Sequence, residues 1–233
     1  MRKGLIVSVL ALTALPATTW AGNLTLRVGA FLPRADSDLF SDASELYTLD
    51  PLAPGPPGLT SSDWTGFTGG IEYAGVVARN VEFGIHVDGY SRTLDTAYRD
   101  FTRDSGADIL QTLKLTVVPT GVTVRIVPSG RRLRFAPYIG GGVDAIYYEY
   151  EAFGDFIDFF DPDQPIFLDS FRSTGWALGF HVAGGARFRL TRDFNLVGEY
   201  RYQWGEDDMG GDFLLNRIDL SGGSATLGFN ISF

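Results

Sequence analysis

The last ten residues of the chain, SATLGFNISF, alternate strictly between apolar and polar positions. Leu227, Phe229, Ile231 and Phe233 share one face, and the residues between them, which include Asn230, share the other. A period of two is the signature of a β-strand with one apolar and one polar side. The segment therefore predicts a strand whose apolar face meets an apolar medium.

Seven earlier segments of the chain show the same alternation. They are rich in aromatic and β-branched residues, and Gly, Pro, Asn and Asp separate them, as is typical of strands joined by turns. With the final segment they predict eight strands, at residues 23–33, 64–74, 81–92, 109–128, 133–150, 175–188, 194–204 and 217–233. We therefore expect an all-β fold.

Every second connection between these strands is long. The short connections are 75–80, 128–132 and 190–193, and the long ones are 33–63, 91–108, 151–174 and 205–216. In an up-and-down meander this pattern places all long loops at one end. Short periplasmic turns opposite long extracellular loops are typical of outer-membrane barrels. The chain is therefore predicted to form an eight-stranded antiparallel up-and-down transmembrane β-barrel.

The fourth predicted strand changes phase part-way along its length. Leu113, Leu115 and Val117 occupy odd positions, whereas Val122 and the apolar residues that follow it occupy even positions. A β-bulge shifts the phase of the side chains by one residue, and it tolerates Pro and Gly. The segment 119–121, Pro-Thr-Gly, lies at the switch, so we expect a bulge there.

The two faces of the strands distinguish a membrane barrel from a soluble, ligand-carrying barrel. The apolar face carries aromatic residues near both strand ends, like the belts at two membrane interfaces. The belt near the long loops is expected to contain Trp64, Phe67, Tyr147, Trp176, Tyr202 and Trp204. The polar face carries charges of both signs, which we expect to pair across a narrow lumen. These lumen residues are Arg27, Glu72, Glu82, His86, Asp88, Lys114, Arg125, Asp144, His181, Arg187, Glu199 and Arg201.

The first 21 residues predict a signal peptide. Arg2 and Lys3 precede an apolar run of about a dozen residues, which is too short to span a bilayer. Thr19 and Ala21 provide a small-x-small cleavage site before Gly22. We expect the chain to be exported, with residues 22–233 forming the barrel domain in the bacterial outer membrane.

The composition excludes several classes of function. The chain contains no cysteine, which rules out disulfides, thiolate metal sites and a cysteine nucleophile. Its formal net charge of -9 argues against a nucleic-acid partner, because phosphates require patches of Lys and Arg.

In these features the chain resembles the small eight-stranded outer-membrane proteins of the OmpW/OmpA-like group. Phe229, Ile231 and Phe233 resemble the signal that the barrel-assembly machinery reads, and Pro137 to Gly142 matches a Pro-Tyr-x-Gly-x-Gly stretch of OmpW-like proteins. The resemblance implies a monomeric or weakly associated protein that contacts outer-membrane lipid and lipopolysaccharide. It also implies passage of small hydrophobic molecules through an apolar lumen. The ion-pair-rich lumen predicted here departs from that pattern and fits a structural barrel better.

The candidate chemistry centres on the two histidines of the chain, His86 and His181. Outer-membrane lipid A deacylases carry a His-x-Ser pair on a barrel strand. The corresponding third positions here are Asp88 and Ala183, so neither pair supplies a nucleophile. Buried polar groups are usually hydrogen-bonded, and we expect the histidines to be so. We therefore expect no catalytic residues and no cofactor.

The segment 151–174 is acidic and rich in phenylalanine. Asp155, Asp158, Asp161 and Asp163 offer the oxygen ligands that Ca²⁺ prefers. Their spacing lacks the glycine and the closing glutamate of an EF-hand, so no metal ligands are assigned. The alternatives are a loop whose phenylalanines pack over the barrel mouth and a surface that binds a partner.

Three functions remain open from the sequence. The leading hypothesis is a non-enzymatic integral outer-membrane barrel, either a structural envelope protein or a narrow conduit for small molecules. The alternative is a surface interaction or adhesion module that acts through its long acidic extracellular loops. A lipid-modifying enzyme that uses His86 or His181 is the third and weakest hypothesis.

Overall fold

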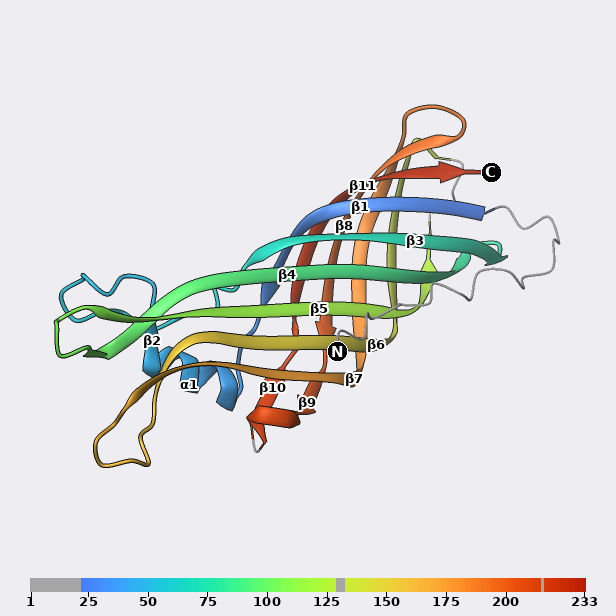
Figure 1. The fold of residues 1–233 in the computed structure, drawn as a ribbon. Helices are drawn as coiled ribbons and strands as arrows, with labels where there is room; N and C mark the ends of the chain where they lie inside the picture. The colour runs from blue at the N-terminus through green and yellow to red at the C-terminus, as the bar shows by residue number, and fades with distance from the viewer. Residues whose placement is uncertain (1–21, 129–132, 215) are drawn as a thin grey trace, which may run out of the picture.

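The computed structural model describes residues 22–128, 133–214 and 216–233, so the predicted signal peptide lies outside the described residues. Eight strands form a closed antiparallel barrel, to which the short strand β2 is added (Figure 1). The sheet order is β2-β4-β3-β1-β11-β8-β7-β6-β5, and pairing between β4 and β5 closes the ring. The predicted all-β, eight-stranded up-and-down barrel is confirmed.

The elements of the chain have the following bounds. The barrel strands are β1 (Gly22–Pro33), β3 (Gly66–Ala78), β4 (Val81–Thr102), β5 (Asp108–Ile126), β6 (Phe135–Ile157), β7 (Ile166–Arg189), β8 (Phe194–Trp204) and β11 (Gly222–Ser232). The long connections contain α1 (Asp38–Leu46), β2 (Tyr47–Thr48), β9 (Glu206–Asp208), the 3₁₀ helix η1 (Gly211–Phe213) and β10 (Arg217–Asp219).

The first and last strands form the seam of the barrel. β1 pairs with β11 in a continuous register in which Leu24 lies opposite Ile231, and Gly22 and Phe233 exchange two backbone hydrogen bonds of 3.0 Å. A closed ring leaves no strand edge unpaired, which hydrocarbon requires because it offers the backbone no other partner.

Four neighbouring strands are much longer than a membrane crossing. β4, β5, β6 and β7 contain 22, 19, 23 and 24 residues, whereas about 9–11 residues cross a bilayer. The loops predicted at 91–108 and 151–174 are therefore largely wrong. The strands continue outward and are joined only at residues 103–107 and 158–165. The four strands β4–β7 thus form a curved extension beyond the bilayer (Figure 1).

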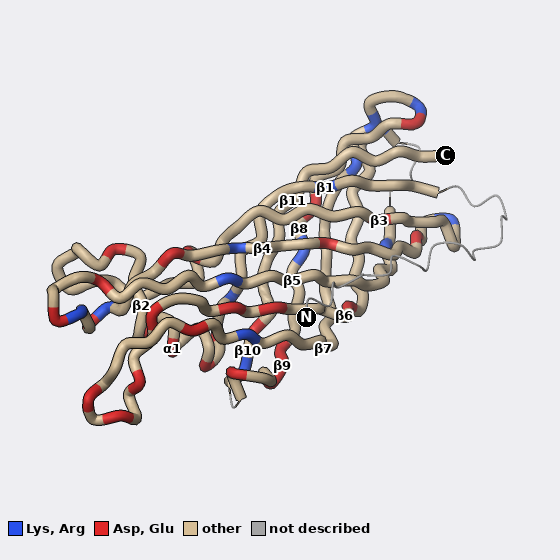
Figure 2. The backbone as a smooth tube through the Cα atoms, in the orientation of Figure 1, with Lys and Arg blue, Asp and Glu red and all other residues tan. Residues whose placement is uncertain are grey.

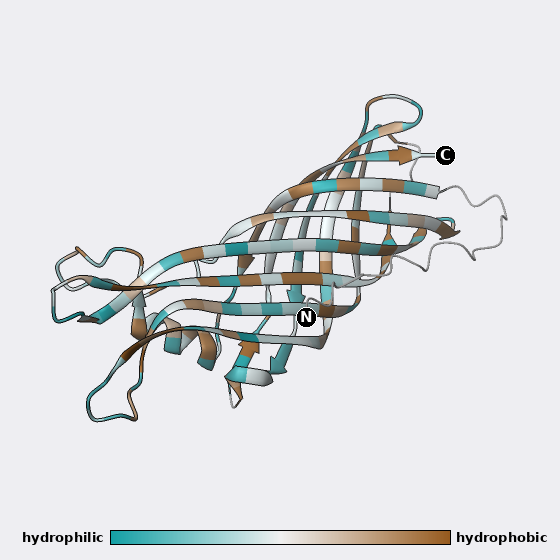
Figure 3. Ribbon diagram, viewed as in Figure 1, coloured by the Kyte–Doolittle hydropathy of each residue, from teal (hydrophilic) through white to brown (hydrophobic). Residues whose placement is uncertain are grey.

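The chemistry of the two faces reverses along these long strands. In the lower part of β6, the half that begins at Phe135 near the short turn, the outward-facing Ile139 and Val143 are exposed and the inward-facing Asp144 is buried. In the upper part, the half that belongs to the extension and ends at Ile157, Glu149 faces outward and Tyr150 is buried inside. The lower part is therefore apolar outside and polar inside, and the upper part has the arrangement of a soluble protein. Hydrophilic and hydrophobic residues alternate along the strands (Figure 3).

The same reversal explains the phase change in β5, and the predicted bulge at residues 119–121 is wrong. The pairing of β5 with β6 runs without interruption through Pro119 and Thr120, and the pairs of β5 with β4 on either side, Thr120 with Val87 and Val117 with Tyr90, keep the same register. Odd-numbered residues face inward throughout, from Leu113 and Val117 to Arg125. The apolar side chains change face because the surroundings change from water to lipid, not because the backbone slips.

An apolar core fills the extension. α1 contributes Leu39, Phe40 and Ala43 to it, and Leu115 of β5 and Ile218 of β10 are almost fully buried in it. α1 was not predicted, although its buried residues have helical spacing. Among the described residues, no helix is both long and apolar enough to cross a membrane.

Trp64 belongs to this core and not to the outer aromatic belt, where it was predicted. It is 1% exposed and packs edge-on against Phe40 with ring centroids 5.4 Å apart. The exposed aromatic residues of the belt include Phe67 and Trp176, which are 68% and 64% exposed. Acidic residues concentrate at the end of the molecule that contains α1, β9 and the far ends of β4–β7 (Figure 2).

We expect Leu115→Ala to destabilise the folded protein by about 2–5 kcal/mol, because the substitution leaves a cavity in a packed core. Thr116→Ala on the water-facing side of the same strand is the matched control and should change stability by no more than about 0.5 kcal/mol. Urea unfolding in lipid vesicles measures both. Equal effects of the two substitutions would show that the extension has no packed core.

Candidate functional site

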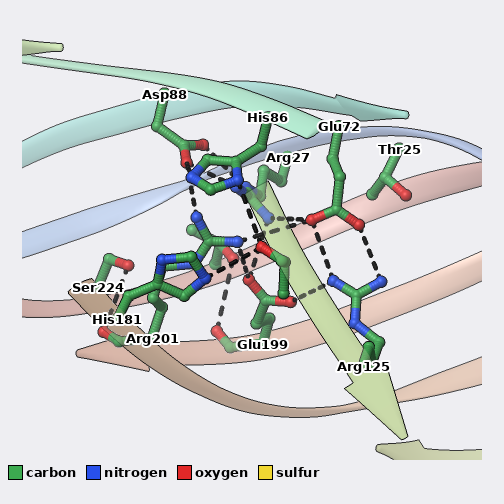
Figure 4. A network of polar contacts seen from close by, with 12 residues as sticks. Thr25, Arg27, Glu72, His86, Asp88, Arg125, His181, Glu199, Arg201 and Ser224 are labelled. Atoms are coloured by element: carbon green, nitrogen blue, oxygen red, sulfur yellow. Dashed lines mark hydrogen bonds and ion pairs between the residues drawn. The ribbon is translucent and has the colours of Figure 1, made fainter. Parts of the chain in front are cut away.

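The lumen contains a network of charged side chains at the level of the outer apolar band. Its members project inward from β1, β3, β4, β5 and β8, as the strand alternation dictates (Figure 4). Three arginines and three carboxylates form its centre: Arg27, Arg125 and Arg201 with Glu72, Asp88 and Glu199. We call these six residues the lumen ion network.

Arg27 joins its own strand, β1, to three other strands of the barrel. Its Nε and Nη2 donate to the two carboxylate oxygens of Asp88 at 2.8 and 2.5 Å. Its Nη1 donates to Glu72 Oε2 at 3.2 Å and to Glu199 Oε1 at 3.0 Å. A bidentate guanidinium–carboxylate pair fixes orientation as well as charge, so Arg27 holds β1, β3, β4 and β8 at a set spacing.

Arg125 and Arg201 complete the network. Arg125 Nη2 donates to Glu72 at 3.0 Å and to Glu199 at 3.3 Å. Arg201 donates to Asp88 at 3.1 Å and to Glu199 at 3.2 Å. Equal numbers of positive and negative groups therefore balance one another inside the barrel.

Two further groups extend the network toward the short turns. Arg187 donates through both terminal nitrogens to the carboxylate of Glu82. Tyr138 donates to Glu199 at 2.8 Å, and the guanidinium of Arg125 lies 4.4 Å from the centre of its ring. Tyr138 was not assigned a role from the sequence. The alternation of its strand, which turns Tyr138 inward, could have identified it as a lumen residue.

A second cluster lies beside the ion network and contains both histidines. His181 Nδ1 lies 2.8 Å from Asp144 Oδ2, and His86 Nε2 lies 3.2 Å from Asp144 Oδ1. On the other side of the rings, Thr123 Oγ1 lies 3.0 Å from His181 Nε2 and 3.4 Å from His86 Nδ1. All four residues are at most 2% exposed. We call them the histidine cluster.

Glycines on the inner wall make room for these side chains. A Cβ atom on Gly121 would lie 2.0 Å from Asp144 Oδ1, and one on Gly142 would lie 2.9 Å from His181 Cε1. A Cβ atom on Gly70 would lie 1.8 Å from Asp88 Oδ1. Gly140 and Gly142 of the run 140–142 face inward, so these two glycines provide space inside the barrel.

The predicted inward placement of Lys114 is wrong. Its side chain lies on the outer face of the extension, 41% exposed, with Nζ 3.4 Å from Glu151 Oε2. Beside it, Arg172 donates to Glu149 at 2.6 Å. Partial burial raises the pKa of Glu149, but the bond and charge of Arg172 outweigh that effect and hold its pKa below the ordinary value. The remaining predicted lumen residues all lie inside.

The acidic segment does not gather its carboxylates into one site. Arg103 binds Asp155, while Asp158 and Asp161 accept hydrogen bonds from nearby backbone N–H groups of their own loop. Among the described residues, the group with the spacing of metal ligands is instead His86, Asp144 and His181.

The residues of the predicted assembly signal lie on the outer face of the last strand. Phe229, Ile231 and Phe233 are 61%, 37% and 68% exposed. The ring of Phe233 stacks at 6.2 Å on that of Tyr73.

Arg125→Met should destabilise the protein by about 3–5 kcal/mol, because it removes one of the arginines that Glu72 and Glu199 share and leaves an excess negative charge buried in the lumen. Lys114→Met, which removes an exposed ion pair, should cost at most about 1 kcal/mol. Urea unfolding in vesicles compares the two. An Arg125→Met protein as stable as the wild type would show that the lumen ion network does not hold the barrel together.

Comparison with known proteins places the chain among barrels of this kind. The solved structure of the outer membrane protease OmpT from Escherichia coli shares 11% identity, with a TM-score of 0.50 over 95% of this chain and 99% of that one. Neisserial surface protein A shares 15% identity, with a TM-score of 0.48 over 91% and 96%. OprG from Pseudomonas aeruginosa shares 13%, with a TM-score of 0.48 over 92% and 97%. At these identities the likeness concerns the fold alone.

No curated protein matches the sequence. The family described as outer membrane protein beta-barrel domain matches residues 5–233, which is nearly the whole chain. The protein therefore belongs to the outer membrane protein beta-barrel domain family, and its place is the bacterial outer membrane.

Proposed function

We propose that the protein is a closed, non-enzymatic barrel that anchors a rigid protein extension at the cell surface. The observation that carries this proposal is the double closure of its lumen. The lumen ion network fills the membrane-spanning part, and the apolar core of the extension fills the part above it.

The space beside the network is too small for a conduit. The cavity lined by Glu72, Arg125 and Tyr138 has a volume of about 10 Å³ open to a water-sized sphere, and the one lined by Asp88 and Tyr90 about 20 Å³. A single water molecule needs roughly 10–15 Å³ by this measure. These volumes favour a structural barrel over passage of small molecules, hydrophobic or polar.

The histidine cluster supports the non-enzymatic assignment. Thr123, His181 and Asp144 follow one another in the order hydroxyl, imidazole, carboxylate, as in a hydrolase triad. However, His86 and His181 are each 1% exposed, and neither of the two cavities described above is lined by Thr123 or by the histidines. A lipid substrate in the membrane therefore has no route to these groups.

Planar bilayers that contain the purified protein should show no steady single-channel current, because both closures block ion flow. An open porin measured in the same bilayers is the positive control. Steady current steps from the wild-type protein would contradict the proposal and support a conduit.

A second function, attachment to a cationic surface, has support from the tip of the β6–β7 hairpin. Phe160 is fully exposed there, and Leu168 nearby is 67% exposed. Asp161 and Asp163 follow Phe160 in the same turn, and acidic residues concentrate at this end of the molecule (Figure 2). Exposed apolar side chains of this kind mark contact sites, and the negative charge favours a basic partner.

This function is tested by replacing residues 158–165 with Asn-Gly, which forms a tight hairpin turn. Removing the whole segment 151–174 is unsuitable, because Ala152 and Phe156 belong to the core. Cells that display the variant should lose most of their adherence to a polylysine-coated surface and to an epithelial layer. Asp104→Asn in the neighbouring hairpin turn is the control. Unchanged adherence of the replacement variant would reject attachment through this tip.

A further inference from the structure

We infer that His86, Asp144 and His181 bind one divalent transition-metal ion of the zinc class inside the barrel. The three side chains come from β4, β6 and β7, which are distant in sequence but converge on one point of the lumen. Two imidazoles and a carboxylate form a ligand set that zinc and neighbouring metals prefer. The sequence reasoning assigned no metal ligands to these residues.

The separations between the ligand atoms fit a metal ion. One ligand atom from each residue lies within 4.8 Å of the other two. Asp144 oxygens lie 2.8 Å from His181 Nδ1 and 3.2 Å from His86 Nε2. Bonds of about 2.0–2.2 Å in a tetrahedral site place ligands roughly 3.4 Å apart. The site therefore needs only small side-chain rotations to close around the ion.

The charge of Asp144 calls for a cation. The carboxylates of the lumen ion network each face at least one arginine, and Glu82 faces Arg187. Within the described part of the chain, the ion-pair partners of Asp144 are the two histidines alone. A buried charge without compensation costs several kcal/mol, and a metal ion bound by Asp144 supplies the compensation.

Hydrogen-bond accounting at Thr123 leads to the same conclusion. If both imidazoles are neutral and donate to Asp144, their other nitrogens are both acceptors, and the single hydroxyl proton of Thr123 satisfies only one of them. If the metal takes the nitrogens that face Asp144, both remaining N–H groups donate to the two lone pairs of Thr123 Oγ1. Metal-bound histidines characteristically donate their second N–H in this way.

Two further features distinguish the cluster from a plain hydrogen-bonded core. His86 Nε2 and Asp144 Oδ1 lie 3.2 Å apart without an aligned hydrogen bond, although both atoms are buried. Gly121 leaves open the space directly against Asp144 Oδ1, which any other residue would fill. The site is closed to solvent on both sides, so the ion is captured as the barrel folds and has a structural role.

The test uses tag-free protein refolded from urea into detergent with Zn²⁺, followed by dialysis and atomic emission analysis. About one Zn²⁺ per chain should remain bound, as expected for a three-ligand site. Refolding with Co²⁺ should produce the visible absorption of a low-symmetry, imidazole-bound ion. His181→Gln and His86→Gln should each abolish retention, and Thr123→Val should weaken it about 10–100-fold.

The double variant Asp161→Asn, Asp163→Asn controls for adventitious binding to the acidic extracellular end and should retain the ion. Heat-modifiable migration on gels reports folding, so that a histidine variant which fails to fold is recognised and replaced by the Thr123→Val comparison. Refolded wild-type protein that retains no Zn²⁺ overturns the proposal and leaves a proton as the cation of the cluster. Retention that survives both histidine substitutions overturns it as well.

Discussion

The strands of this barrel pass from lipid into water while their pairing register stays the same, and the rest of the structure depends on this constraint. Every strand of the ring must keep its backbone paired, both in hydrocarbon, where the alternative is an unsatisfied polar group, and in water above it. The register of β5 with β4 and with β6 is the same on both sides of that boundary. Since the backbone pairing is the same in both surroundings, only the choice of side chains adapts each strand to lipid or to water. Apolar residues face outward below the boundary, and above it an apolar core forms inside, while a few apolar side chains such as Leu110 and Leu168 stay exposed.

The interior of the barrel also differs on the two sides of the boundary: polar side chains fill it below, and an apolar core fills it above. Below the boundary, where the outer face is apolar, the lumen is filled by arginine–carboxylate pairs and the histidine cluster. Above it, α1 and the β9–β10 hairpin cover the inner face of the extended strands with an apolar core. Glycines such as Gly70 and Gly121 let charged side chains fit within a narrow ring. The protein thus resembles a soluble domain that stands on a polar, ion-paired base.

The sequence predicted the ring, its closure and nearly all of the lumen residues, because period-two alternation fixes which side chains share a face. It failed where one pattern has two physical causes. The phase change in β5 has the same appearance as a bulge, and the polar outer faces of β4, β6 and β7 above the membrane have the appearance of loops. Lys114 was placed inside for this reason. The meeting of His86, Asp144 and His181 depends on stagger between strands, which one sequence does not specify.

The change of the apolar side chains from the outer to the inner face shows how deeply each strand lies in the membrane. On each long strand, the position at which apolar side chains cross from one face to the other marks the height at which hydrocarbon ends. On β6 that height lies between Tyr147 and Glu149, and on β7 between Trp176 and Thr174. Because Tyr147 lies opposite Trp176 in the ladder, the two readings agree. The position of the membrane surface on such a barrel can thus be located from the sequence, because the apolar side chains change face at that height.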